Sequence, residues 1–353
     1  MDEDNRAITL IDVADRAGVS RATASLVVRG TGRVSDATRA RVRQAMADLG
    51  YVYNRGAASL RRQQADTVGV IITNVANPFF GELLRGFEAV LSGAALSCLI
   101  VNTGQDPAAQ IRAIEELRER RVAGVAVVPA SGSTAAFVDT LRSWRLPHVF
   151  MTRYIKNAPT HYVGADDQRG GYLATAHLLD HGTRQIAYLG GPVNVQSRWD
   201  RRAGVEAALH DHGLDADQLF DLPGESSGSG GLAIGQHLID NNLLPQAIVC
   251  HSDQVAFGVY RALRRSHSHA LPRIIGYDDI PTASLWEPPL TTISTNANEL
   301  GGLAAHNLLQ QIDTSPDTTL TTITTPSLII RESCGCHDQP NAAEPTATPR
   351  PAG

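Results

Sequence analysis

The sequence predicts two kinds of structure in one chain: a small all-α module at the N-terminus and a large α/β core after it. Its 353 residues suffice for two or three domains of ordinary size. With 42% hydrophobic and 19% charged residues, the composition excludes a disordered or coiled-coil protein. The first sixty residues are basic and helical in pattern, whereas the rest is acidic and alternates β-rich runs with helical segments.

Three short helices are predicted in the N-terminal module. The first has apolar residues at the spacing i, i+3, i+4 and i+7, which are Leu10, Val13, Ala14 and Ala17. Gly18 ends this helix, and Ser20 is placed to cap a second one over residues 21 to about 28. Ser35 caps a third helix, which Gly50 ends. The third helix repeats the apolar spacing at Val42, Ala45, Met46 and Leu49.

The tight turn between the first two helices makes a helix-turn-helix unit, in which the second helix enters the major groove of DNA. Charge favours this interpretation. Residues 1–62 carry eleven arginines and seven acidic residues, whereas residues 63–353 carry 20 basic and 29 acidic ones. Because a basic module indicates a polyanionic partner, we expect Arg39 and Arg43 on the third helix to contact phosphates. The alternative is a three-helix hairpin whose arginines are merely solvated.

In the remainder, β-rich apolar runs alternate with segments of helical spacing, which predicts parallel sheets with helices on both faces. The runs lie at 68–73, 98–101, 122–128, 148–151, 185–189, 247–250 and 273–276. Their number suits either one wide sheet or two doubly wound subdomains. Two facing subdomains would form a ligand cleft at the carboxyl ends of their strands. Residues 338–353, rich in Pro, Ala and Thr, are predicted to be a disordered tail.

The sequence gives no sign of a membrane, a disulfide framework or a cofactor. No apolar run is long enough to cross a bilayer, and the acidic N-terminus is unlike a secretory signal, so we expect a cytoplasmic protein. Two of the four cysteines lie inside apolar runs, where a reduced thiol packs as a small hydrophobe. The motif CGCH at 334–337 lacks the second ligand pair of a structural zinc site, so no metal is expected either.

Ordered motifs along almost the whole chain resemble the lactose-repressor (LacI/GalR) family of bacterial transcription regulators. In the module they lie at 10–20, 34–39 and 49–51. In the core they are NPFF at 77–80, GADD at 164–167, IAYLG at 186–190, RAG at 202–204, SDQ at 252–254, GYDD at 276–279 and PLTT at 289–292. The resemblance ends near residue 334. It implies a DNA-binding headpiece followed by a core like that of periplasmic sugar-binding proteins.

The resemblance also implies domain limits and partners. The headpiece would span 5–53, a hinge helix 54–66, and the effector-binding and dimerisation core 67–336. Of the core, subdomain one would take 67–165 and 294–322, and subdomain two 166–293 and 323–336. Such proteins usually act as homodimers or tetramers on pseudo-palindromic double-stranded DNA operators, and a small-molecule effector controls them.

The family pattern can be carried over to the recognition helix residue by residue. Ser20, Thr23 and Ser25 match positions that contact the DNA backbone. Arg21 and Ala22 stand where the family varies its base readers, and an arginine there can pair with guanine.

Two residues of this helix depart from the pattern. Leu26 replaces a frequent arginine, and either packs beneath the helix or contacts a thymine methyl. Arg29 replaces a frequent asparagine. We therefore expect an operator half-site that differs from the common one.

Residues 53–62 match the family's hinge, which includes Asn54. The segment is too short to be stable as an isolated helix, and Gly56 weakens it further, so we expect it to order on DNA. Leu60 falls where the family inserts a leucine between base pairs from the minor groove.

The same comparison predicts an effector site. Its residues would be Phe79, Phe80, Arg153, Ser197, Arg201, Ser252 and Asp278. Phe80 fits a core position equally well. Asp278 would accept hydrogen bonds from sugar hydroxyls. Three positions depart from the family, because Thr152 stands for a common aspartate, Ser252 for an asparagine and Glu225 for an aromatic residue.

The leading functional hypothesis is a sequence-specific DNA-binding repressor controlled by a sugar or sugar derivative, with a weak leaning toward maltose-regulon repressors. A second hypothesis is a solute-binding protein of the transport kind, against which the basic headpiece argues. A third is an α/β enzyme, but the chain has no nucleophile-elbow, phosphate-loop or dinucleotide motif. The acidic pairs at 166–167 and 278–279 are the remaining acid–base candidates, although adjacent residues seldom face one substrate.

Overall fold

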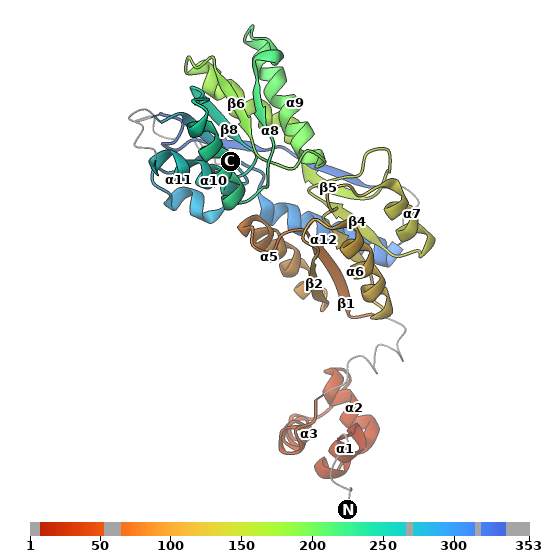
Figure 1. The fold of residues 1–353 in the computed structure, drawn as a ribbon. Helices are drawn as coiled ribbons and strands as arrows, with labels where there is room; N and C mark the ends of the chain where they lie inside the picture. Colours follow the sequence, from red (N-terminus) through yellow and green to blue (C-terminus); the bar gives the residue numbers. More distant parts are fainter. Residues whose placement is uncertain (1–7, 53–64, 266–270, 315–318, 337–353) are drawn as a thin grey trace, which may run out of the picture. The chain divides into compact units, whose positions relative to one another are not determined.

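The computed structural model describes residues 8–52, 65–265, 271–314 and 319–336, which form two compact units divided between Ala65 and Asp66 (Figure 1). The first unit holds α1 (Leu10–Ala17), α2 (Arg21–Arg29) and α3 (Asp36–Leu49). Thr9, Ser20 and Ser35 each accept a hydrogen bond from the backbone N–H three residues on, and a left-handed glycine ends each helix. The three predicted helices and the predicted serine and glycine caps are confirmed.

A small core joins these three helices. Its buried residues are Val13, Ala14, Ala17, Ala24, Val27, Val42 and Ala45. Leu26 is half-buried on α2, and a Cβ built on Gly32 would lie 3.0 Å from the Leu26 Cδ2 atom. The Leu26 side chain therefore packs against the turn that follows α2, outside the buried cluster of the headpiece, and its contact with a thymine methyl stays a prediction.

The second unit contains two six-stranded sheets, so the single wide sheet is excluded. The first sheet is parallel throughout in the order β11-β5-β4-β3-β1-β2. Its strands are β1 (Thr67–Ile72), β2 (Ser97–Asn102), β3 (Val125–Val127), β4 (His148–Met151), β5 (Tyr162–Ala165) and β11 (Thr321–Thr324). The second has the order β12-β10-β9-β8-β6-β7, with β12 antiparallel to β10. Its strands are β6 (Ile186–Leu189), β7 (Phe220–Leu222), β8 (Ala247–Cys250), β9 (Arg273–Tyr277), β10 (Thr291–Ser294) and β12 (Ser327–Ile329).

Helices cover both faces of each sheet, as the alternation predicted (Figure 1). On the first sheet, α5 (Pro78–Gly93) and α12 (Ala297–Thr314) lie on one face, and α6 (Pro107–Glu119) and α7 (Ala135–Ser143) on the other. On the second, α10 (Gly228–Asp240) and α11 (Asp253–Arg265) lie on one face, and α8 (Asp167–Asp180) and α9 (Gln196–Asp211) on the other. Two short 3-10 helices, η1 (Ala216–Gln218) and η2 (Pro281–Leu285), complete the described elements. The predicted fold class is confirmed.

The chain crosses between the two subdomains three times, and two crossings lie one or two residues beyond the approximate limits that were expected. Ser294 still pairs with Ser327 in the second sheet, although residue 294 was expected to open the return to subdomain one. Thr324 still pairs with Ala165 in the first sheet, two residues beyond the expected limit at 322. Both crossings fall later because ladder pairing, which the sequence pattern does not display, continues to the ends of these strands.

Among the described residues, no helix is both long and apolar enough to cross a membrane. The predicted hinge, with Asn54 and Leu60, and the predicted tail at 338–353 lie outside the described residues.

Glycines allow helices to approach one another closely over each sheet. A Cβ built on Gly86 of α5 would lie 1.8 Å from the Asn298 carbonyl oxygen of α12. A Cβ on Gly171 of α8 would lie 2.0 Å from the Arg201 carbonyl oxygen of α9. The α8–α9 contact therefore fixes the backbone from which Arg201 extends.

We predict that Gly86→Ala destabilises the core by about 1–3 kcal/mol or more, because the backbone of α12 must move to admit the methyl group. Gly81→Ala on the same helix is the matched control. A Cβ there meets nothing within 4 Å, so the gain in helix propensity should stabilise the protein by roughly 0.5–1 kcal/mol. Chemical denaturation measures both effects, and equal free energies of unfolding for the two variants would contradict the close packing.

Candidate functional site

All seven residues predicted for the effector site line one cavity between the two sheets. The complete lining is Asn77, Phe79, Phe80, Thr152, Arg153, Ser197, Arg201, Ser226, His251, Ser252 and Asp278. These residues follow β1, β4, β7, β8 and β9 or lie in the first two turns of α5 and α9. The cavity thus lies at the carboxyl ends of strands from both subdomains, where open parallel sheets bind ligands.

Four lining residues were not predicted as site residues: Asn77, Thr152, Ser226 and His251. Asn77 caps α5 by accepting a hydrogen bond from the Phe79 N–H at 3.1 Å. The Ser226 hydroxyl lies 3.1 Å from the Ser252 hydroxyl. Their position after strands was the available signal. Glu225, named as a departure from the family, is exposed and does not line the cavity.

Two aromatic rings close the side of the cavity formed by α5. Phe79 and Phe80 are both buried, with ring centroids 5.4 Å apart in an edge-to-face arrangement. Both also belong to the hydrophobic core between α5 and the sheet. The two interpretations of Phe80 are therefore compatible, because its ring packs in the core and also lines the cavity.

Arg201 is the most constrained charge of the cavity. Its Nε atom donates to Asp167 Oδ1 at 2.9 Å, and its Nη1 atom donates to the His251 carbonyl oxygen at 2.6 Å. The guanidinium carbon lies 3.5 Å from the centroid of the Tyr277 ring. The Tyr277 hydroxyl donates to the same Asp167 oxygen at 2.7 Å. Burial alone would lower the pKa of Arg201, but Asp167, Tyr277 and Asp278 raise it, so the guanidinium stays charged.

Asp278 is a buried carboxylate held in an unusual backbone conformation. Its φ angle is +111°, a region that non-glycine residues rarely adopt and that recurs at functional sites. Burial raises the pKa of Asp278 to about 7, although Arg201 and a hydrogen bond from Asn77 lower it in part. A ligand group that donates a hydrogen bond to Asp278 would therefore bind favourably, since the charge of this buried carboxylate is only partly compensated in the free protein.

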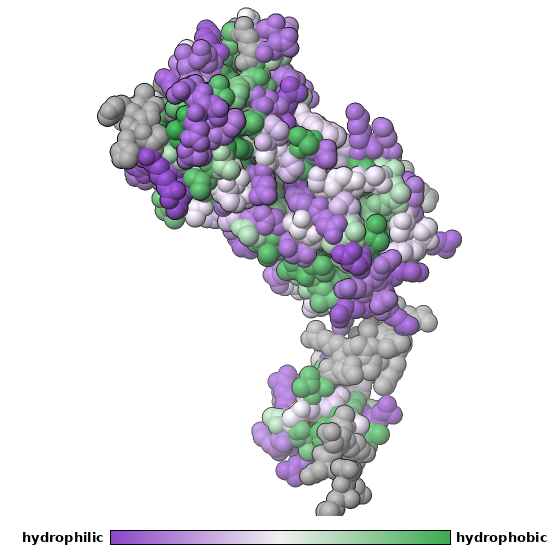
Figure 2. All heavy atoms as spheres, viewed as in Figure 1, coloured by the Kyte–Doolittle hydropathy of each residue, from purple (hydrophilic) through white to green (hydrophobic). Residues whose placement is uncertain are grey.

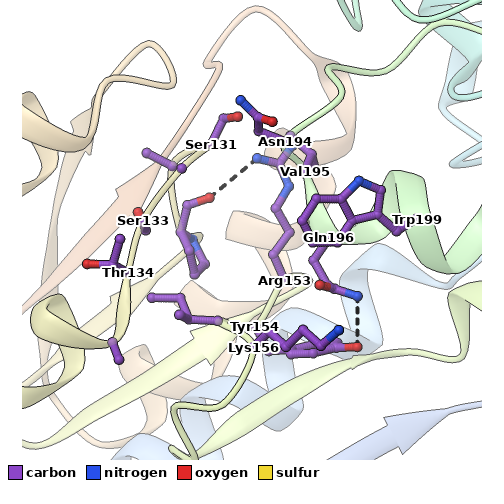
Figure 3. A pocket seen from close by; sticks show the side chains of 15 residues that line it. Ser131, Ser133, Thr134, Arg153, Tyr154, Lys156, Asn194, Val195, Gln196 and Trp199 are labelled. Atoms are coloured by element: carbon purple, nitrogen blue, oxygen red, sulfur yellow. Dashed lines mark hydrogen bonds between the residues drawn. The ribbon is translucent and has the colours of Figure 1, made fainter.

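Arg153 stands between this inner cavity and a larger outer one. Its Nη1 atom donates to Gln105 Oε1 at 2.9 Å, and burial lowers its pKa to about 10. In Figure 3 it lies between the polar loop that carries Ser131 and Ser133 and the side chain of Trp199 on α9. The outer cavity has a volume of about 400 Å³, whereas the inner one has about 50 Å³.

The two volumes indicate which cavity can accept a ligand in this arrangement of the subdomains. Ligand pockets commonly measure about 300–1,000 Å³. The inner cavity is smaller than that, so the two subdomains or the side chains between them must move apart before a ligand enters. The outer cavity already has the size of a small-molecule site.

The acidic pairs considered for acid–base catalysis separate in the structure. Asp166 caps α8 by accepting a hydrogen bond from the Arg169 N–H, while Asp167 binds Arg201. Asp279 accepts a hydrogen bond from Arg331 at 2.7 Å, while Asp278 faces the cavity. Neither pair therefore presents two carboxylates to one substrate.

The headpiece places the predicted base readers on its surface. Arg21 and Ala22 are exposed in the first turn of α2. Ser20 and Thr23 are joined by two hydrogen bonds, from the Thr23 N–H to Ser20 Oγ at 3.1 Å and between the two hydroxyls at 2.9 Å. Arg29 folds back so that its Nε atom donates to the Ser25 carbonyl oxygen at 3.0 Å. The cap geometry of Ser20 therefore fixes where α2 begins.

The family described as "Bacterial regulatory proteins, lacI family" matches residues 9–54. The family described as "Periplasmic binding proteins and sugar binding domain of LacI family" matches residues 65–332. The ribose operon repressor of Escherichia coli K12 is 34% identical over 307 residues, which cover 86% of this chain and 93% of that protein.

Two solved structures extend the match to the fold. The Lac repressor dimer bound to operator and an anti-inducer has a TM-score of 0.80 at 26% identity, with 93% of this chain and 99% of that one covered. A LacI family transcriptional regulator from Enterococcus faecium with bound ribose has a TM-score of 0.69 at 30% identity, with 76% and 98% covered. Headpiece, core and their order in the chain all agree, and the protein therefore belongs to the LacI family of bacterial regulatory proteins.

Proposed function

We propose that this protein is a transcriptional repressor that binds a pseudo-palindromic operator through residues 1–62 and responds to a small sugar held in the inner cavity. One observation carries the proposal: Arg201, Asp278 and Phe79 line the same cavity, and both subdomains contribute to that lining. A basic helix-turn-helix unit precedes this cleft in the same chain. Because operator DNA is intracellular, the site of action is the cytoplasm.

The chemistry of the cavity fits a polyhydroxylated ligand. A carboxylate accepts hydrogen bonds from two adjacent hydroxyls, guanidinium groups donate to ring and hydroxyl oxygens, and an aromatic ring covers an apolar sugar face. The similarity to a ribose operon repressor and to a ribose-bound regulator favours a pentose. The leaning toward maltose regulators, which rested on four residues of α2 and one turn, stays a weaker alternative, since a maltose regulon regulatory protein of Escherichia coli K12 is 31% identical over 320 residues.

A ligand in this cleft would couple the two subdomains. Phe79 and Arg153 come from the first subdomain, whereas Arg201 and Asp278 come from the second. A sugar that contacts both sides binds the closed arrangement better than the open one, and this difference in affinity sets how far it shifts the equilibrium.

The two other hypotheses are less well supported. A solute-binding protein of the transport kind would share the cleft but would not need the headpiece. Catalysis would need two groups aimed at one substrate, and the acidic pairs diverge. The relatives named above are regulators, and we propose that this protein too is not an enzyme.

The edge strand β2 favours a homodimer. Strands at the edge of a sheet offer unpaired backbone groups, which natural proteins usually cover. On β2, Leu99 and Ile100 are 38% and 50% exposed, and Figure 2 shows apolar side chains gathered over this region of the core. The similar Lac repressor structure is described as a dimer. We therefore propose that β2 and its surroundings contact a second copy of the chain.

The first test is selection of bound DNA from a random pool, followed by affinity measurements on the selected site. Phosphate contacts release counterions, so affinity should fall by roughly 10³-fold or more between about 50 and 200 mM salt if six phosphates are contacted. A fragment that begins at Asp66 should lose operator binding while keeping its fold, since it is a compact unit of its own. Equal operator affinity of the fragment and the full chain would refute the assignment to the headpiece.

Ile100→Asp should shift the protein toward monomer in analytical ultracentrifugation, because the charge would be desolvated at the proposed interface. Ile323→Asp is the matched control. Ile323 is 59% exposed on β11, the opposite edge strand of the same sheet. The dimer surface would have to be placed elsewhere if both variants kept the parent's sedimentation.

Asp278→Asn should bind the effector about 5- to 150-fold more weakly, because it leaves a ligand hydroxyl without its acceptor in a buried site. Operator binding should persist but respond poorly to the sugar panel, in which ribose is the first member. Asp166→Asn is the control, since asparagine caps a helix as well as aspartate does. A parent-like midpoint for Asp278→Asn would remove Asp278 from the site.

The pH dependence of effector binding provides an independent check. Ligand hydroxyls stabilise the charged form of Asp278, whose pKa is about 7 in the free protein. Effector affinity should therefore rise by up to about tenfold per pH unit below 7 and level off above it. Calorimetric titrations across this range should lose the dependence in Asp278→Asn, and an equally steep profile in that variant would assign the proton to another group.

A further inference from the structure

Three potential metal ligands converge far from the effector cleft, within the part of the chain that the structure describes. His177 and His181 lie one turn apart at the carboxyl end of α8, and Cys336 follows β12 in the last described segment. The Cys336 Sγ atom lies 3.4 Å from His177 Nε2 and 3.1 Å from His181 Nε2. The ligand atoms of all three residues lie within 4.8 Å of one another.

We propose that His177, His181 and Cys336 form a binding site for a divalent zinc ion. Tetrahedral zinc holds thiolate sulfur at about 2.3 Å and imidazole nitrogen at about 2.0–2.1 Å, which separates sulfur from nitrogen by roughly 3.5 Å. The two observed sulfur–nitrogen distances are already close to this separation. Zinc also combines a borderline-soft character with a preference for mixed sulfur and nitrogen ligands.

The site is preformed by contacts that do not involve its own ligands. The Ser333 hydroxyl donates to the Ile274 carbonyl oxygen at 2.6 Å and accepts from the Thr291 N–H at 2.8 Å. These bonds attach the last segment to β9 and β10. Gly335 then turns with a φ of +79°, which returns Cys336 toward α8.

Arg273 fixes the other side of the site. Its Nη1 atom donates to the His181 carbonyl oxygen at 2.7 Å, so it braces the end of α8. Its positive charge opposes a cation nearby, but the thiolate of Cys336 would compensate that charge when a metal binds. A bound metal would add a further tie between the last segment and α8.

The position of the site indicates a structural role. Asp167, which holds Arg201, begins α8, whereas His177 and His181 lie at its far end. A helix rises about 1.5 Å per residue, so roughly 15–21 Å separate Asp167 from the two histidines. A zinc ion there would clamp subdomain two without entering the effector cavity.

The test uses the reduced, tag-free full-length protein with Zn²⁺ or Co²⁺ alone. We expect one equivalent of zinc after equilibrium dialysis, and a Co²⁺ complex with tetrahedral ligand-field bands and a thiolate-to-metal charge-transfer band. Zinc should raise the melting temperature, since it binds the folded state, and a chelator should reverse this rise. Cys336→Ser and His181→Ala should each weaken metal binding by at least tenfold and abolish the stabilisation by zinc.

Two control variants keep the proposal open to refutation. Cys98→Ser removes a half-buried thiol on β2, and His306→Ala removes an exposed imidazole on α12. Both should retain metal binding. His181 is exposed, so its removal should leave the fold intact even if Cys336→Ser unfolds. Absence of stoichiometric uptake by the parent, or equal uptake by His181→Ala and His306→Ala, would overturn the proposal.

Discussion

The buried ion pair between Arg201 and Asp167 is the constraint on which the cleft depends. Its partners come from the second turn of α9 and the first residue of α8, and Tyr277 at the end of β9 both stacks on the guanidinium and donates to the carboxylate. Removing one partner of such a pair costs about 3–5 kcal/mol, because it strands a buried charge. Since Gly171 lets α9 approach α8 closely enough to form the pair, helix packing and site geometry are set together.

Local signals explain why so much of the fold was predictable. The headpiece helices begin at threonine or serine caps and end at left-handed glycines, and both features act within a few residues. The apolar runs that were predicted as strands, such as 148–151 and 247–250, are buried on both faces. Strands β5, β7, β10, β11 and β12 were missed because they are short and most carry polar residues. In β10, Thr291 and Thr292 are fully buried, and their partners lie far away in the sequence: the Thr291 N–H donates to Ser333 Oγ, and the Thr292 hydroxyl donates to Asp253 Oδ1.

The candidate sites show the same division between local and distant information. The seven effector residues were found through a family resemblance and their position after strands, and the fold places them in one cavity. Asp167 was considered only as half of an acidic pair. Its partner Arg201 lies 34 residues later, and no local sequence pattern indicates that the two side chains meet. No second ligand pair lies near the CGCH motif in the sequence. His177 lies 159 residues before Cys336, and only the fold brings the two side chains together.

Strain and unpaired charge together explain why this cleft is suited to switching. Thr152, with φ of +59°, and Asp278, with φ of +111°, face the cavity from opposite subdomains, and such conformations persist only when the surrounding structure enforces them. Arg201 is held within subdomain two by Asp167 and the His251 carbonyl oxygen, so it changes little when the cleft opens. Asp278 is not compensated in this way, because burial keeps its pKa near 7. A ligand that donates to Asp278 therefore gains most in the closed cleft, and this difference is what allows a small molecule to choose between two arrangements of the core.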